Sequence, residues 1–132
     1  MNTPLWGIFY FLSLYFMANY DLLPIYKKTY DFLLETFQFS KSFTREYKYT
    51  IGQELKNETI RLILSIYRAN STINRRYILL EEARTTLETI RLLLRLTKDL
   101  KQITLKDFVS LNEKIESISK QLVAWQKSVK AE

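Results

Sequence analysis

Apolar residues recur every three or four positions from about residue 24 to residue 129, and this spacing predicts four long amphipathic helices. We expect these helices over residues 24–39, 45–69, 77–101 and 104–129, joined by short connections. The sequence has only two Gly and two Pro among 132 residues, so it offers few of the turns that a β-rich fold requires. The pattern therefore predicts an all-α fold, an antiparallel up-down four-helix bundle.

The stretch 77–101 carries more than the single apolar face that a surface helix needs. One face comprises Leu80, Ala83, Leu87, Ile90 and Leu94. A second comprises Leu92, Leu93, Leu96 and Leu100. Steps of seven, four and three residues place a basic stripe between them, made of Arg84, Arg91, Arg95 and Lys98. We interpret the two apolar faces as packing within the bundle and against another subunit, and the basic stripe as a surface for an anionic partner.

The other three helices each show an apolar face. In the helix expected over residues 24–39, the apolar face comprises Tyr26, Tyr30, Leu33 and Phe37. We assign these residues to the core or to subunit packing rather than to base stacking. In the second it comprises Ile51, Leu55, Leu62, Ile66 and Ala69. In the fourth it comprises Leu105, Phe108, Ile115, Ile118, Leu122, Trp125 and Val129, with Trp125 packing at the end of the bundle.

The first connection, residues 40–46, is polar apart from Phe43, whose side chain we expect to pack into the bundle. Ser42 or Thr44 is expected to cap the following helix. Gly52 interrupts a helical pattern, where glycine costs about 1 kcal/mol relative to alanine, and it either allows a close helix approach or is tolerated without purpose.

The second connection, residues 70–74, is rich in Asn, Ser and Thr. We expect Asn70 to take a left-handed conformation and Asn74 to cap the next helix. Arg75 and Arg76 then open that helix, where positive charge is mildly unfavourable, so this pair is a candidate for outward binding. Thr104 is expected to cap the fourth helix.

Residues 1–18 contain no charged side chain. The apolar run 5–17 is shorter than the roughly 20 residues that span a membrane. Met17 resembles a natural start, so we interpret residues 1–19 as an N-terminal extension and residues 20–132 as the bundle domain. A short membrane-associating or partner-binding segment is the alternative.

The chain has 20 Lys and Arg against 14 Asp and Glu, a formal net charge of +6, and no Cys or His. Most of the excess lies in residues 45–101, which points to nucleic acid or an acidic membrane as partner, with ordinary solvated helix faces as the alternative. Without Cys, His or a Gly-rich phosphate loop we expect no catalytic residues, no metal site and no cofactor.

Three stretches carry a resemblance to a known family: YKYTIGQEL, IYRANS and LLLRLTKDL, in this order. Together with YKKTYDFLLETF and ISKQLVAWQKS, they make residues 20–128 similar to the accessory variability determinant (Avd) proteins of diversity-generating retroelements. Four-helix proteins encoded as intervening sequences in ribosomal RNA genes are related, and a structural or interaction bundle of that type is the alternative.

The resemblance implies a non-catalytic, cytoplasmic bundle that assembles into a five-fold, barrel-like ring, a homopentamer. It implies binding to the retroelement's reverse transcriptase, to its template RNA and to cDNA, in support of mutagenic cDNA synthesis, with no small-molecule substrate and no membrane partner. Basic positions in the matching stretches are the expected nucleic-acid contacts: Arg84, Arg91, Arg95 and Lys98, with Arg75 and Arg76.

Overall fold

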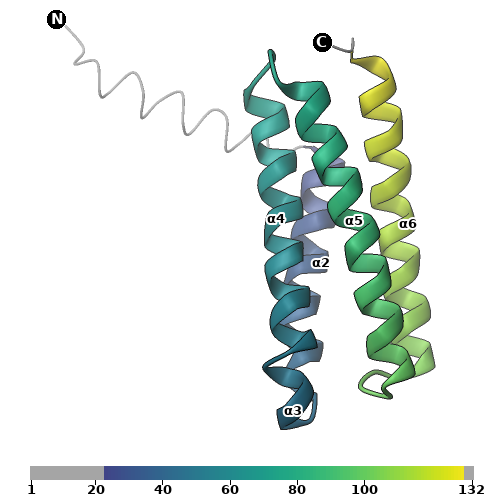
Figure 1. The fold of residues 1–132 in the computed structure, drawn as a ribbon. Helices are drawn as coiled ribbons and strands as arrows, with labels where there is room; N and C mark the ends of the chain where they lie inside the picture. Colours follow the sequence, from purple (N-terminus) through teal and green to yellow (C-terminus); the bar gives the residue numbers. More distant parts are fainter. Residues whose placement is uncertain (1–22, 130–132) are drawn as a thin grey trace, which may run out of the picture.

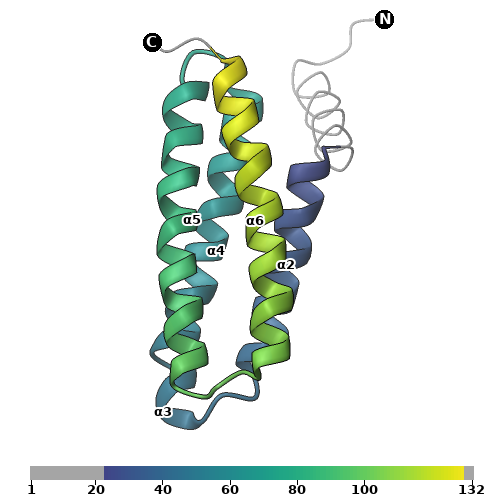
Figure 2. The same cartoon turned by 90° about the vertical axis from the view of Figure 1, so that its right-hand side faces the viewer.

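The computed structural model of the protein describes residues 23–129, and this part of the chain contains helices and connections but no strand. Four long helices form a bundle: α2 (Pro24–Ser40), α4 (Ile51–Ser71), α5 (Arg76–Asp99) and α6 (Leu105–Ser128). A single-turn helix, α3 (Arg45–Lys48), lies between α2 and α4. Successive long helices run in opposite directions (Figure 1). Both α4 and α6 pack against α2 and against α5 (Figure 2), which confirms the all-α, up-down four-helix bundle.

The core is built from one apolar stripe of each long helix. The first expected face of α5 is confirmed, with no member more than 1% exposed: Leu80, Ala83, Leu87, Ile90 and Leu94. The α4 face is also buried, through Leu55, Leu62, Ile66 and Ala69, and α6 adds Leu111, Ile115, Ile118 and Leu122. Trp125 packs on this core as expected, whereas Leu105 is exposed. On the second side of α5, Leu92 is 67% and Leu96 is 41% exposed, so their packing against another subunit stays a prediction.

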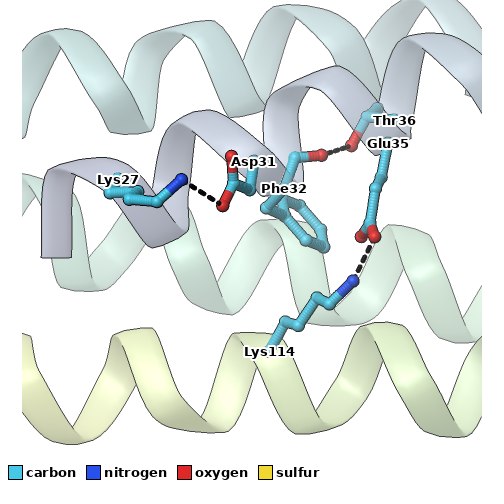
Figure 3. A network of polar contacts seen from close by, with 6 residues as sticks. All are labelled: Lys27, Asp31, Phe32, Glu35, Thr36 and Lys114. Atoms are coloured by element: carbon cyan, nitrogen blue, oxygen red, sulfur yellow. Dashed lines mark hydrogen bonds and ion pairs between the residues drawn. The ribbon is translucent and has the colours of Figure 1, made fainter. Parts of the chain in front are cut away.

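Helix α2 buries a different face from the one that its aromatic spacing predicts. Tyr30 and Phe37 are exposed, and the core is instead contacted by Ile25, Thr29, Phe32, Thr36 and Ser40. The threonine at position 36 can be buried because its hydroxyl donates to the Phe32 carbonyl at 2.9 Å (Figure 3). The assignment of the aromatic stripe to the core is therefore wrong, because it equated the most apolar face with the buried one. Its packing against another subunit stays a prediction.

Polar contacts close the seam between α2 and α6. Lys114 Nζ of α6 donates to Glu35 Oε1 of α2 (Figure 3), and Lys28 Nζ donates to Ser117 Oγ at 2.6 Å. The side chains of Glu35 and Lys114 are each 40% exposed, so their ion pair contributes little free energy. The contacts nevertheless link α2 to α6 along this seam.

The predicted helix 45–69 is interrupted at Tyr49 and Thr50, so α4 begins only at Ile51. Thr50 has φ −112° and ψ −91°, which lies outside the helical region. Thr44 does precede a helix, α3, but its side chain makes no capping hydrogen bond. The break at Tyr49 and Thr50 has a consequence for packing. The two aromatic side chains on its N-terminal side pack on the end of the core.

Those two side chains are Phe43, which is buried as predicted, and Tyr47, which is partly buried against the core. Gly52 explains how Phe43 fits. A Cβ added at Gly52 would lie 3.2 Å from Phe43 Cδ2 and 3.3 Å from the Tyr47 carbonyl oxygen. Gly52 therefore serves the close approach of this connection to α4, rather than being tolerated without purpose.

We expect Gly52→Leu to lower the free energy of unfolding by about 1–3 kcal/mol, because the added side chain must displace the buried ring of Phe43 or the backbone at Tyr47. Urea denaturation followed by circular dichroism measures the change. The control is Gln53→Leu at the neighbouring exposed position. An equal stability of the Gly52 variant and the parent would contradict the close packing.

Both asparagine predictions for the second connection are wrong. Asn70 lies inside α4, and the residue that precedes α5 is Arg75 rather than Asn74. The C-terminal end of α4 is capped by another route, because Arg76 Nε donates to the Ala69 carbonyl at 2.7 Å and its Nη2 to the Asn70 carbonyl at 3.0 Å, so no left-handed residue is needed at Asn70.

The third connection contains the left-handed residue, Lys101, with φ 60°. The Thr104 cap is confirmed, since its Oγ1 accepts a hydrogen bond from the Asp107 amide at 3.0 Å.

The proposed N-terminal extension, residues 1–19, and the alternative start at Met17 lie outside the described residues, so the domain boundary stays a prediction.

Candidate nucleic-acid interface

The basic stripe of α5 begins at the seam with α6, where Arg84 is engaged in polar contacts. Its Nη1 donates to Gln126 Oε1, and it lies 3.8 Å from Glu81 Oε2. Gln126 is only 3% exposed, and its amide donates in turn to Glu81 Oε2 at 2.6 Å. Arg84 thus satisfies a buried amide, which is a structural role.

Arg91 is engaged in the same way. Its Nη1 pairs with Glu116 Oε1 of α6, and its Nε lies 3.3 Å from Glu88 Oε1 of its own helix. The Arg91 side chain is only 28% exposed. Two carboxylates therefore neutralise this guanidinium, and a phosphate would have to compete with both of them.

The remaining two positions of the stripe, Arg95 and Lys98, differ from each other. Arg95 is exposed and has no ion pair within residues 23–129. Lys98 Nζ lies 4.8 Å from the centroid of the Phe108 ring and 3.4 Å from Asp99 Oδ1. The four positions do share one side of α5, but the contacts separate Arg95, which is exposed and unpaired within the described residues, from Arg84, Arg91 and Lys98, which all contact other side chains.

Arg75 and Arg76 also differ from each other. Arg75 is exposed at the N-cap of α5, and within the described range no side-chain contact holds it. Arg76 donates to the last carbonyls of α4, so its guanidinium is held against the bundle. Binding of nucleic acid by these arginines stays a prediction, and the geometry favours Arg75.

The tertiary structure reveals a division of charge that the helix wheels miss. The α3 end, defined as residues 40–50 and 95–107, joins two connections and contains seven Lys or Arg and three Asp or Glu. The opposite end, residues 23–28, 68–78 and 120–129, contains seven Lys or Arg and no acidic residue. The middle of the bundle, between these ends, holds five basic and nine acidic residues.

The net positive charge of the described bundle therefore lies at its two ends, and its middle is net negative. Counting Lys and Arg near the predicted connections would have found this signal. A sum over the central helices, residues 45–101, combined parts of both ends with the middle and concealed it.

The accessible cations differ between the two ends. At the opposite end, Lys27 pairs with Asp31 at 3.4 Å, Lys28 donates to Ser117, and Arg76 caps α4, which leaves four cations without a side-chain ion pair or hydrogen bond to residues 23–129: Arg68, Arg75, Lys120 and Lys127. At the α3 end, six cations have no side-chain ion pair or hydrogen bond to residues 23–129: Lys41, Arg45, Lys48, Arg95, Lys101 and Lys106. The α3 end also carries Tyr49, whose side chain is 70% exposed.

A groove of about 620 Å³ lies on the outer side of α4 and α5. Its walls combine Arg61 and Arg68 of α4 with Glu81 and Glu82 of α5. The opposed charges make it a poor site for a polyanion compared with the two ends.

Within residues 23–129 no group of three or more acidic side chains is placed to hold a metal ion. None of the helices in this range is long and apolar enough to cross a membrane.

Comparison with known proteins identifies one matching family. A family model described as bAvd-like matches residues 23–129, which include all four long helices and α3. A search of curated proteins gives no significant match.

Proposed function

Because the chain belongs to the bAvd-like family, we propose that it is a non-catalytic accessory subunit of a diversity-generating retroelement, one that binds nucleic acid and the reverse transcriptase. In this role it holds the template RNA and the polymerase together during mutagenic cDNA synthesis in the cytoplasm. The family match covers the whole described bundle, as did the resemblance of its sequence stretches to Avd proteins.

The observation that carries RNA binding is the charge at the bundle ends. Cations without carboxylate partners can neutralise phosphates and release condensed counterions, which gives affinity without base-sequence information. Such a surface positions an RNA backbone, and specificity then comes from the RNA's shape and from the polymerase.

Assembly into a homo-oligomer, a five-fold ring, is part of the proposal. Two sides of the bundle expose apolar side chains that the core does not use: Tyr30, Leu34 and Phe37 on α2, and Leu92 and Leu96 on α5. Exposed apolar surface of this kind marks interaction sites in many proteins. A ring would repeat each basic end around its axis, so that weak phosphate contacts add through avidity.

We expect the intact protein to bind a structured RNA with an affinity that falls steeply with salt. Neutralising roughly four phosphates corresponds to a slope of about −3 in a plot of log affinity against log salt concentration. Fluorescence anisotropy at several salt concentrations measures the slope, and light scattering of the same sample gives the subunit number.

A failure to bind RNA even at low salt would contradict the proposal. The exposed cations would then serve solubility or a protein partner. The structural bundle of the ribosomal intervening-sequence type would become the better description.

A further inference from the structure

We propose that the α3 end is a binding site for single-stranded RNA, in which Tyr49 stacks on a base and the surrounding cations contact the flanking phosphates. The inference rests on the proposed function and assigns RNA binding to one place on the bundle. That place is distinct from the Arg84 and Arg91 half of the basic stripe.

Two connections that are far apart in the sequence form this site together. The first includes α3, and the second joins α5 to α6; both lie at the same end of the bundle (Figure 1). The Thr44 amide donates to Gln102 Oε1 at 2.9 Å, and Gln102 Nε2 donates to the Leu100 carbonyl at 3.0 Å. The Thr44–Gln102 bond ties the two connections to each other, and the second bond orients the Gln102 side chain, so the basic residues of both connections lie together at this end of the bundle.

Within residues 23–129, the bundle does not engage four of these cations. Arg45 and Lys48 on the first connection, and Lys101 and Lys106 on the second, make no side-chain ion pair or hydrogen bond within the described part of the chain. Lys106 even stands in the first turn of α6, where the helix dipole disfavours positive charge. Bundle stability therefore does not explain them, whereas a polyanionic ligand does.

Tyr49 supplies the second feature of the site. Of the three aromatic residues around α3, Phe43 is buried and Tyr47 packs on the core, but Tyr49 is left 70% exposed between α3 and α4. Because Tyr49 lies between α3 and α4, the two helices fix the position of its backbone and leave its ring exposed. An exposed aromatic ring beside several cations is the combination that single-stranded nucleic-acid sites use.

The opposite end lacks this combination. Lys27, Lys28 and Arg76 there are engaged by other groups of the protein, and the unpaired Arg68, Arg75, Lys120 and Lys127 have no exposed aromatic ring among residues 23–28, 68–78 and 120–129. Its most exposed large apolar residue is Ile73, which offers no aromatic ring for stacking. A single strand is favoured over a duplex at the α3 end because a duplex hides the faces of its bases from Tyr49.

The test uses the full-length protein and an oligouridylate of about 15 nucleotides with a fluorescent label, read by anisotropy. We expect Tyr49→Ala to weaken binding about tenfold with an unchanged salt slope, and Tyr49→Phe to bind within about twofold of the parent, because stacking needs only the ring. We expect Arg45→Gln with Lys106→Gln to weaken binding and to reduce the salt slope by about 1.4.

The matched control removes the same charge from the opposite end, by Lys120→Gln with Lys127→Gln, and we expect it to change the affinity less than twofold. Equal losses at both ends, or a Tyr49→Ala variant that binds like the parent, would overturn the site while leaving the proposed function in place. If the parent protein itself binds no RNA at low salt, both proposals fail. Thermal melting of each variant shows whether the bundle is intact.

Discussion

Phe32→Ala is expected to lower the free energy of unfolding by about 3–5 kcal/mol, a large part of the 5–15 kcal/mol that is typical of a whole domain. Phe32 is 0% exposed and is the largest side chain that α2 places in the core. Its removal leaves a cavity, which the surrounding leucine and isoleucine side chains fill only in part. Urea denaturation followed by circular dichroism, at two protein concentrations, measures the loss.

The matched control is Phe37→Ala on the same helix, where the ring is 41% exposed and lies 5.3 Å from Lys56 Nζ. In an isolated bundle we expect this change to cost less than about 1 kcal/mol. A larger cost that grows with protein concentration would mean that Phe37 packs against another subunit. If Phe37→Ala lowered the free energy of unfolding more than Phe32→Ala did, the aromatic face of α2 would be the buried one. The burial of α2 described above would then be contradicted.

Leu87→Ala is expected to cost about 2–5 kcal/mol, because Leu87 is 1% exposed in the face that α5 turns toward the core. Leu92→Ala removes the same atoms from a position that is 67% exposed, so its cost to the isolated bundle is expected to stay below about 1 kcal/mol. The same denaturation experiment compares them. An equal loss of stability in both variants would show that α5 is covered on two sides, as its two leucine-rich faces suggest.

These two comparisons separate folding from assembly. Phe32 and Leu87 report on the core of one chain, whereas Phe37 and Leu92 report on whatever covers the outer faces of α2 and α5. A ring of the proposed kind predicts that at least one outer substitution lowers the subunit number seen by light scattering. If neither does, the subunits associate through other surfaces or do not associate.

The engaged arginines affect how any RNA-binding experiment should be designed. Replacing Arg91 leaves Glu116 of α6 without its partner, so a loss of binding in such a variant would mix a damaged seam with a lost phosphate contact. Arg95 is the more informative member of the basic stripe, because it is exposed and holds no other element in place.

The sequence alone determined the helical class, the core face of α5 and most of the core faces of α4 and α6, although Leu105 is exposed and the buried Leu111 was not expected. Those features depend on local periodicity, which a helix wheel reads directly. It also determined the Thr104 cap, which needs only residues within one turn, and the family resemblance.

Only the tertiary structure decided which face of α2 is buried, because two threonines with satisfied hydroxyls are as acceptable in a core as the aromatic residues beside them. It also decided which side chains of the basic stripe are paired with other groups of the bundle. A wheel places Arg84 and Arg91 on one side of α5, but their partners, Gln126 and Glu116, lie 42 and 25 residues further along the chain. Charge is neutralised by neighbours in space, and the pairing of connections at the α3 end likewise exists only once the bundle has formed.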